Sequence, residues 1–190
     1  ATIDPLKEVT PLDGSGRKMI TRGSYHIYSN SLSNAAISVL IYPNGRDDVA
    51  VGYAGRATNA NELATLKGAA SYTGKGFIAD LRPTDVIVSE AVTNITANFD
   101  TRKVSGLVSD CNFSVDLKEA HIVNDGGVIG FNGVASIVNT SQSLNANGVY
   151  DGRFMGQGAK EVAGKALFTP ASVNTNYGGI GVSFSGSKVE

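Results

Sequence analysis

Residues that alternate between apolar and polar dominate the chain from residue 66 to its end. An alternation with period two places apolar side chains on one face of a strand, so it predicts half-buried β-strands. Polar connections rich in Asn, Asp and Gly separate the runs and are typical of turns. The predicted strands are 66–79, 90–99, 103–109, 113–123, 128–139, 148–156, 161–169 and 178–185.

The short connections predict how these strands are joined. None is long enough for a crossover, which favours an up-and-down meander over a Greek key. Eight antiparallel strands close on themselves without leaving sheet edges, and side chains fill a barrel of this size. We therefore expect an eight-stranded antiparallel up-and-down β-barrel over residues 63–190.

Residues 1–62 follow a less regular pattern and form a separate, smaller β-rich part in this prediction. Residues 21–29 and 49–54 fit strands. Residues 35–42 also fit a strand, with a short helix as the competing interpretation, because periodicity does not separate the two. Residues 57–66 indicate a linker or a short helical turn, and residues 1–19 an irregular lead-in. The predicted fold class is all-β.

Composition narrows the function. The 16 Lys and Arg residues balance 17 Asp and Glu residues, whereas a nucleic-acid-binding protein shows a basic excess. No apolar run reaches the length of a membrane-spanning helix, so we expect no membrane insertion. The chain lacks the Gly-x-Ser-x-Gly, His-Glu-x-x-His, P-loop and Cys-x-x-Cys motifs. That pattern favours a binding protein over an enzyme.

The single cysteine and the first residue bear on the compartment. Cys111 has no partner for an internal disulfide, and we expect it to be a small buried side chain. The chain begins at Ala1 rather than Met, which we interpret as the mature end left by signal-peptide removal rather than an arbitrary boundary. Because that first residue is not the Cys that carries a lipid anchor, the prediction is a secreted protein.

The two histidines lie in different parts of the chain. By strand alternation His26 and Tyr28 share one face of their strand, and Tyr25 lies on the other. His121 lies near the end of the predicted strand 113–123, and unbroken alternation would turn it into the barrel. Because a buried unpaired imidazole is costly, we expect it at the barrel rim or beyond a bulge. For each histidine an ordinary surface or hydrogen-bonded role stays open.

Residues 148–168, GVYDGRFMGQGAKEVAGKALF, consist of two alternating runs joined by a small-residue turn at 156–160, which predicts a hairpin. The pattern GxFxGxxAxEVxGxA resembles the closing hairpin of the transferrin-binding-protein-B-like (TbpB-like) β-barrel family of Gram-negative bacteria. The similarity extends loosely over about residues 65–190. In this family a handle domain packs on a barrel, so the resemblance implies that residues 1–62 form the handle.

The resemblance also implies a ligand, since the secreted hemophilin-type members bind haem through histidine. It implies that His26 and His121 are metal ligands on the two axial positions of haem b iron, for which imidazole is well suited. Tyr25, Tyr28 and Tyr42 would supply cofactor-binding walls. The chain would then be a secreted hemophore for iron acquisition and virulence.

The implied partners follow from that function. They are haem, haemoglobin as a candidate haem source, a TonB-dependent outer-membrane receptor that takes the haem, and a Slam-type outer-membrane translocator that exports the chain through the periplasm.

The resemblance implies an alternative function as well. Other family members are surface proteins that bind a host protein, such as transferrin, haemoglobin or factor H, through exposed loops. Residues 140–147 and 170–179, with Tyr177, are the candidate loops for such a surface.

Overall fold

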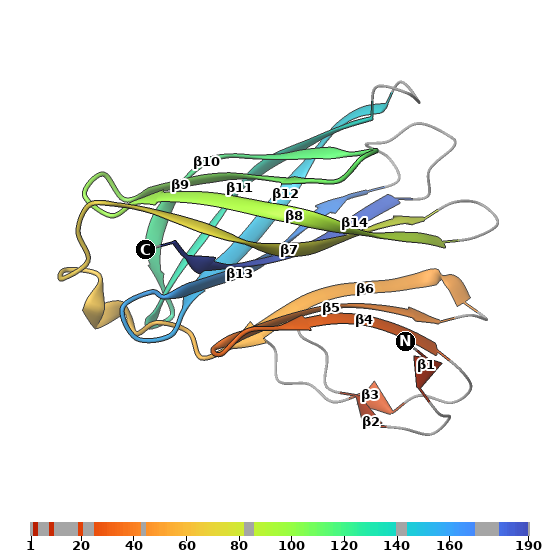
Figure 1. The fold of residues 1–190 in the computed structure, drawn as a ribbon, viewed down its shortest axis with the longest axis horizontal. Helices are drawn as coiled ribbons and strands as arrows, with labels where there is room; N and C mark the ends of the chain where they lie inside the picture. The colour runs from red at the N-terminus through yellow and green to blue at the C-terminus, as the bar shows by residue number, and fades with distance from the viewer. Residues whose placement is uncertain are drawn as a thin grey trace.

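The computed structural model describes residues 2–3, 8–9, 19–20, 25–42, 45–81, 86–139, 144–169 and 179–189 of the 190-residue chain. Within these ranges, side chains are described for residues 28–39, 50–81, 87–139, 144–169 and 179–189. The molecule consists of a closed β-barrel and a smaller β-sheet that packs against one side of it (Figure 1).

The barrel confirms the predicted architecture. It has eight strands, and each pairs antiparallel with the next one along the chain. The last strand then pairs antiparallel with the first and closes the ring. The strands are β7 (Ala69–Leu81), β8 (Val86–Asn98), β9 (Lys103–Ser109), β10 (Ser114–Asp125), β11 (Val128–Asn139), β12 (Leu144–Met155), β13 (Glu161–Phe168) and β14 (Gly179–Lys188).

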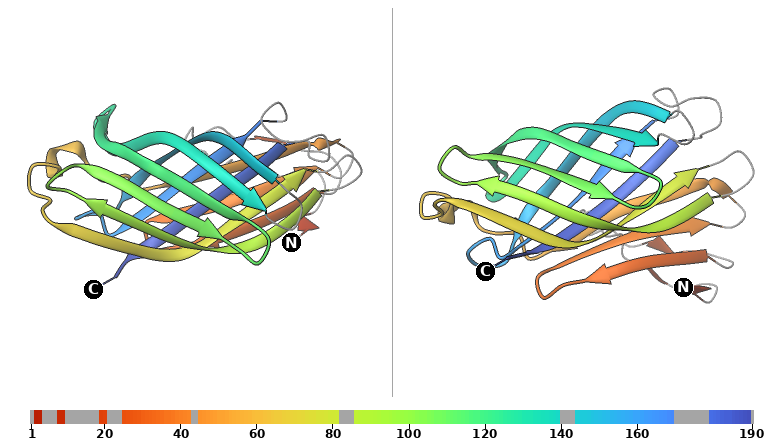
Figure 2. Two further views of the ribbon diagram at one scale, coloured as in Figure 1. Left: turned by 90° about the horizontal axis from the view of Figure 1, so that it is seen from above. Right: turned by 45° about the horizontal axis from the view of Figure 1, so that its top comes forward.

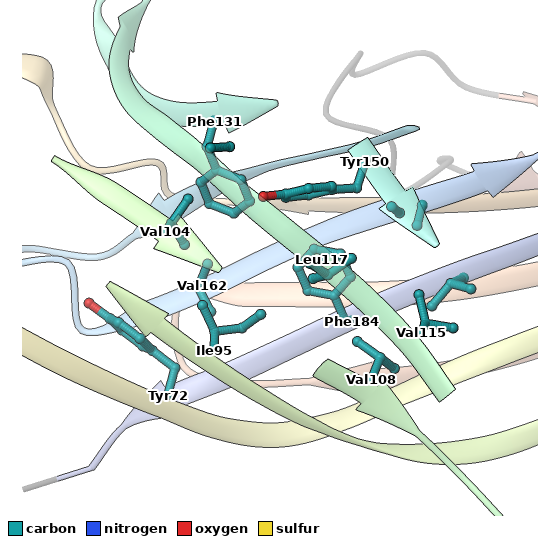
Figure 3. Close-up of a cluster of buried hydrophobic side chains, with 14 of the residues drawn as sticks. Tyr72, Ile95, Val104, Val108, Val115, Leu117, Phe131, Tyr150, Val162 and Phe184 are labelled. Atoms are coloured by element: carbon teal, nitrogen blue, oxygen red, sulfur yellow. The ribbon is translucent and has the colours of Figure 1, made fainter. Parts of the chain in front are cut away.

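Side chains fill the barrel, whose strands run obliquely to its long axis (Figure 2). Tyr72, Phe154 and Phe184 are fully buried. Phe131 and Phe154 meet edge to face with ring centroids 5.5 Å apart, a favourable arrangement for aromatic pairs. Figure 3 shows side chains from many strands meeting in this interior. The lumen is therefore a packed core.

The smaller sheet, called the handle sheet below, has the strand order β1-β4-β5-β6. All its pairings are antiparallel. A two-stranded sheet, β2-β3, lies beside it, and the chain reaches the barrel through a short 3-10 helix, η1. The bounds are β1 (Thr2–Ile3), β2 (Glu8–Val9), β3 (Met19–Ile20), β4 (Tyr25–Ser31), β5 (Ala35–Tyr42), β6 (Gly45–Gly55) and η1 (Ala60–Glu62).

The N-terminal part follows the prediction in most places. Residues 35–42 form a strand, not the competing helix. A helical turn lies within residues 57–66. The irregular lead-in expected over residues 1–19 is wrong in two places. Thr2 and Ile3 pair with His26 and Tyr25 and add a strand to the handle sheet, and Glu8 and Val9 pair with Ile20 and Met19.

Candidate binding surface at the handle and barrel

The handle sheet packs one apolar face onto the outside of the barrel. Ile37 and Val39 of β5 are fully buried in a cluster that also holds Phe77 and Ala79 from the outer face of β7. Tyr28 of β4 packs its ring on Phe77, with centroids 6.3 Å apart. The sheet contacts barrel strands β7, β13 and β14, so the two parts share this core, called the junction core below.

A carboxylate fixes the end of this junction. Glu161, at the start of β13, is 5% exposed. One of its oxygens accepts a hydrogen bond from the Asn34 backbone N–H at 2.8 Å, and the other accepts from the Asn34 side-chain amide at 2.9 Å. Asn34 lies in the turn between β4 and β5. Burying this charge is tolerated because both oxygens have donors.

The turn before Glu161 explains the sequence pattern found there. Gly156 has φ of +80°, and a Cβ on it would lie 2.8 Å from the Asn34 side chain. Ala159 is buried with φ of 53°, and its carbonyl accepts a hydrogen bond from the Tyr72 hydroxyl at 2.7 Å. The Gly-x-x-Ala-x-Glu residues therefore join the handle sheet, the turn and the barrel interior.

A polar cluster borders the junction core on β12. The Tyr53 hydroxyl, from β6, donates to the Asp151 carboxylate at 2.6 Å. Burial, together with this hydrogen bond to a carboxylate, raises the pKa of Tyr53. Arg153 lies beside it, with its guanidinium 3.8 Å from Asp125. These contacts fix where β6 crosses the barrel wall.

Next to this cluster, three apolar side chains lie exposed on the outer barrel wall. Val134, Val149 and Leu167 are 55%, 59% and 41% exposed. Val149 pairs directly with Val134 on one side and with Leu167 on the other. Directly paired residues on one sheet face are neighbours. We call Val134, Val149 and Leu167 the apolar row.

The sequence profile described as "Factor H binding protein, C-terminal" matches residues 61–166, more than half of the chain. The chain belongs to this factor H binding protein C-terminal family. Most of the barrel, including the Gly-x-x-Ala-x-Glu turn, lies in the matched range. A search of curated protein sequences found no significant match.

Solved structures confirm the TbpB-like fold of this family member. Isotype 1 TbpB from serogroup B Neisseria meningitidis aligns with a TM-score of 0.62 at 16% identity, covering 92% of this chain and 38% of that one. A TbpB mutant from Haemophilus parasuis Hp5 aligns with a TM-score of 0.59 at 17% identity, covering 92% and 40%. A surface lipoprotein aligns with a TM-score of 0.59 at 18% identity, covering 87% and 81%. This chain thus spans about two fifths of the TbpB chains.

A bulge in β10 places His121 on the outside of the barrel. Leu117, Ala120 and Ile122 are buried, whereas the His121 side chain is exposed. The register shifts between Leu117 and Ala120 against β9 and between Leu117 and Ile122 against β11. Of the two expected positions for His121, the bulge is the one that the structure shows.

The other predicted site residues lie in the handle sheet. His26 pairs with Ile41 of β5, while Tyr25 pairs with Ile3 of β1. Tyr42 ends β5. The side chains of His26, Tyr25 and Tyr42 lie outside the described part of the structure. Tyr28 is half-buried against Phe77 in the junction core, so much of its ring already packs against protein.

The structure does not bring the two histidines together. In the barrel ring β10 lies four strands from β14 in either direction, and the handle sheet packs on β14 and its two neighbours. Figure 1 shows β10 and the handle sheet on opposite sides of the barrel. One haem held by both His26 and His121 of the same chain therefore does not fit this fold. Binding by either histidine alone stays a prediction.

The remaining expectations have mixed outcomes. Cys111 is exposed in the turn between β9 and β10, so its predicted burial is wrong. Of the candidate loops, residues 140–143 and 170–178, including Tyr177, lie outside the described residues. Among the described residues there is no group of three or more His, Cys, Asp or Glu side chains arranged to hold a metal ion. No described helix is long and apolar enough to cross a membrane.

Proposed function

We propose that this chain is a surface-exposed or secreted module that binds a host protein. The observation that carries the proposal is the match of residues 61–166 to the factor H binding protein C-terminal profile. The structural neighbours named for transferrin binding support it at the level of fold. In this proposal the hemophore interpretation becomes the second choice.

The packing of the barrel supports a protein partner. Fully buried side chains such as Tyr72, Phe154 and Phe184 occupy the barrel interior, so a partner would bind the outer surface. Protein interfaces contain an apolar centre surrounded by polar residues. The apolar row, with Asn132, Asp151 and Lys165 beside it in the same strands, has that composition.

The test is direct binding to purified host proteins. The folded chain is immobilised, and factor H and transferrin from candidate mammalian hosts are passed over it in surface plasmon resonance. An unrelated eight-stranded barrel protein at the same density serves as the control surface. We expect saturable binding of at least one host protein to this chain alone. Absence of binding to both proteins, together with no serum protein retained above the control, would overturn the proposal.

Haem capture for delivery to an outer-membrane receptor remains a second proposal, in a single-histidine form. The observation that favours it is the exposed His121 imidazole, which makes no hydrogen bond or ion pair with another described residue. Neutral imidazole supplies an axial nitrogen to haem iron. A haem titration by visible absorption, repeated with His26→Ala and His121→Ala, separates the two ligands. A response lost in one variant identifies the ligand, while no saturable response in the unmodified chain rejects the proposal.

A further inference from the structure

The apolar row is the uncovered half of a longer apolar belt around the barrel. Continuing from Leu167, the directly paired residues are Gly181, Ala79 and Val88. Ala79 is 1% exposed and Val88 packs against the junction core. The handle sheet therefore covers one half of the belt, and the row of Val134, Val149 and Leu167 continues beyond it.

The border between the covered and uncovered halves lies at β6. Val51 of β6 sits over Gly181, where a Cβ would come 2.8 Å from a Val51 methyl. Leu167, Val51, Leu81 and Ile180 line an apolar groove at this place. The belt thus passes beneath β6 and emerges on its outer side.

β6 is also an edge strand. It is the last strand in the order β1-β4-β5-β6, and no described strand pairs with its outer edge. Edge strands are usually protected by short length, charged residues or proline. β6 is 11 residues long, and its charged residues, Arg46, Asp47 and Asp48, all lie at its start. Its residues 49–55, VAVGYAG, include neither a charged residue nor proline. Among the described residues, none is hydrogen-bonded to the backbone of this outer edge, and the exposed apolar row lies beside it.

We propose that the outer edge of β6 and the apolar row together form a strand-addition site for an extended segment of a partner protein. This inference rests on the proposed function, because it names the surface through which a host protein would bind. The segment would pair with β6 through its backbone and extend the handle sheet by one strand. Adjacent strands lie about 4.8 Å apart, so the added strand lies over the first part of the row.

The chemistry of the segment follows from the two surfaces. Every second side chain of an added strand points at the barrel wall, where it meets Leu167 and Val149, so these positions are apolar and preferably β-branched. The intervening side chains point to solvent and are polar. Main-chain hydrogen bonds would supply affinity, and the row would supply specificity, as in other cases of strand addition.

The test uses a phage-displayed library of linear twelve-residue peptides selected on the folded chain. Val149→Glu changes the centre of the row, and Val92→Glu is the matched control because Val92 is 57% exposed on β8, outside the row. We expect selected peptides with alternating apolar residues that bind the Val92→Glu variant like the unmodified chain. Their binding to the Val149→Glu variant should be about tenfold weaker or more.

N-methylation of the peptides identifies strand addition. Alternate backbone N–H groups of a strand point to opposite sides, so only one of the two alternate sets bonds to β6. Methylating one set should abolish binding, and methylating the other should be tolerated. Equal tolerance of both sets, or no selected peptide that depends on Val149, would overturn the site. A dimer of this chain that Val149→Glu converts to a monomer would assign the row to a second copy instead.

These outcomes are separate from those of the proposed function. Peptides that meet both criteria, in a chain that binds no host protein, leave the strand-addition site standing and reject the host-protein proposal. A host protein bound equally by the unmodified chain and the Val149→Glu variant, with no such peptides, rejects the site alone.

Discussion

Glu161 ties the handle sheet to the barrel through one carboxylate. Its two oxygens bond to the backbone and the side chain of Asn34. A buried charge of this kind is stabilising only while its donors remain in place. The glutamate in the sequence pattern is thus explained by a contact within the chain, without any ligand.

Replacing Glu161 with Gln tests this contact. A glutamine amide presents one donor where Asn34 also donates, so one hydrogen bond is lost. We expect the free energy of unfolding to fall by about 1.5–3 kcal/mol, the range for hydrogen bonds to charged groups. Urea denaturation followed by circular dichroism measures it. Glu90→Gln is the control, since Glu90 is more than half exposed in its ion pair with Lys75, and it should change stability by less than about 1 kcal/mol. Equal losses in the two variants would contradict the role of Glu161.

Tyr150 predicts how stability depends on alkaline pH. Burial, reinforced by the negative charges of Asp116 and Glu119, raises the pKa of Tyr150 from 10.0 to about 12, and its hydroxyl donates to the Lys118 carbonyl. A raised tyrosine pKa means that the folded state keeps a proton that the unfolded state releases. The stabilisation that protonated Tyr150 gives the folded state is complete below pH 10 and is lost as the pH rises toward about 12.

The free energy of unfolding is measured for the unmodified chain and for Tyr150→Phe between pH 8 and pH 11.5. The phenylalanine variant loses a hydrogen bond, so it should be less stable at pH 8. The difference in free energy of unfolding between the two proteins should shrink above pH 10. Only the unmodified chain loses stability there through the titration of Tyr150. A difference that stays constant through this pH window would show that Tyr150 titrates alike in both states.

At the scale of elements, β13 packs closely against β12 and β14 at Gly164. A Cβ on Gly164 would lie 2.4 Å from the Asp151 carbonyl oxygen and 2.4 Å from a ring carbon of Phe184. The Asp151 carbonyl belongs to the backbone of the paired strand β12, so it cannot move far to make room. The strand therefore requires glycine here for space, not for turn formation.

Gly164→Ala should consequently lower the free energy of unfolding by about 1–3 kcal/mol, the range for overpacking. Where space allows, Gly→Ala usually stabilises a protein by about 0.4–1 kcal/mol, because it lowers the conformational entropy of the unfolded chain. The sign of the change in free energy of unfolding therefore distinguishes close packing from open space. Thermal unfolding measures it. Lys165→Ala, the next residue in β13 and half-buried, serves as the control and should stay within about 0.5 kcal/mol. A stabilised Gly164→Ala variant would contradict the close packing.

Most strands were predictable from the sequence because one of their faces is buried. Alternation identified all eight barrel strands, and residues 103–109 and 128–139 have the predicted bounds. The bulge in β10 was left open, because unbroken alternation gives no sign of the register shift after Leu117. The apolar row was missed. Val134, Val149 and Leu167 are far apart in sequence, and only the strand register brings them together.

The whole molecule depends on the junction core as much as on the barrel interior. Phe77 shows this, because its side chain lies on the outer face of β7, under Tyr28, and is nevertheless only 7% exposed. The family resemblance implied that His26 and His121, one in each part, hold one haem together, and the fold places them on opposite sides of the barrel. Topology, not residue type, decides which distant residues meet.

Phe77→Ala measures the stability that the junction core provides. We expect a loss of about 3–5 kcal/mol, the cost of truncating a buried phenylalanine. Urea denaturation should still show one transition, reported alike by circular dichroism and tyrosine fluorescence. Val92→Ala is the control on the outer barrel wall, 57% exposed, with an expected change of less than about 0.5 kcal/mol. A Phe77→Ala loss as small as that of the control would mean that the sheet rests loosely on the barrel.

The seam between β7 and β14 has a consequence for folding kinetics. Gly179 pairs with Leu81 across about 100 residues of chain, whereas every other barrel pairing is a local hairpin. Contacts between distant residues slow folding because the intervening chain must first be ordered. The hairpins are therefore expected to form early and the seam last. Until the seam closes, β7 is not joined to β14, and the handle sheet lacks the continuous surface of β7, β14 and β13 on which it packs. The handle and the barrel should therefore acquire their final packing in the same late step.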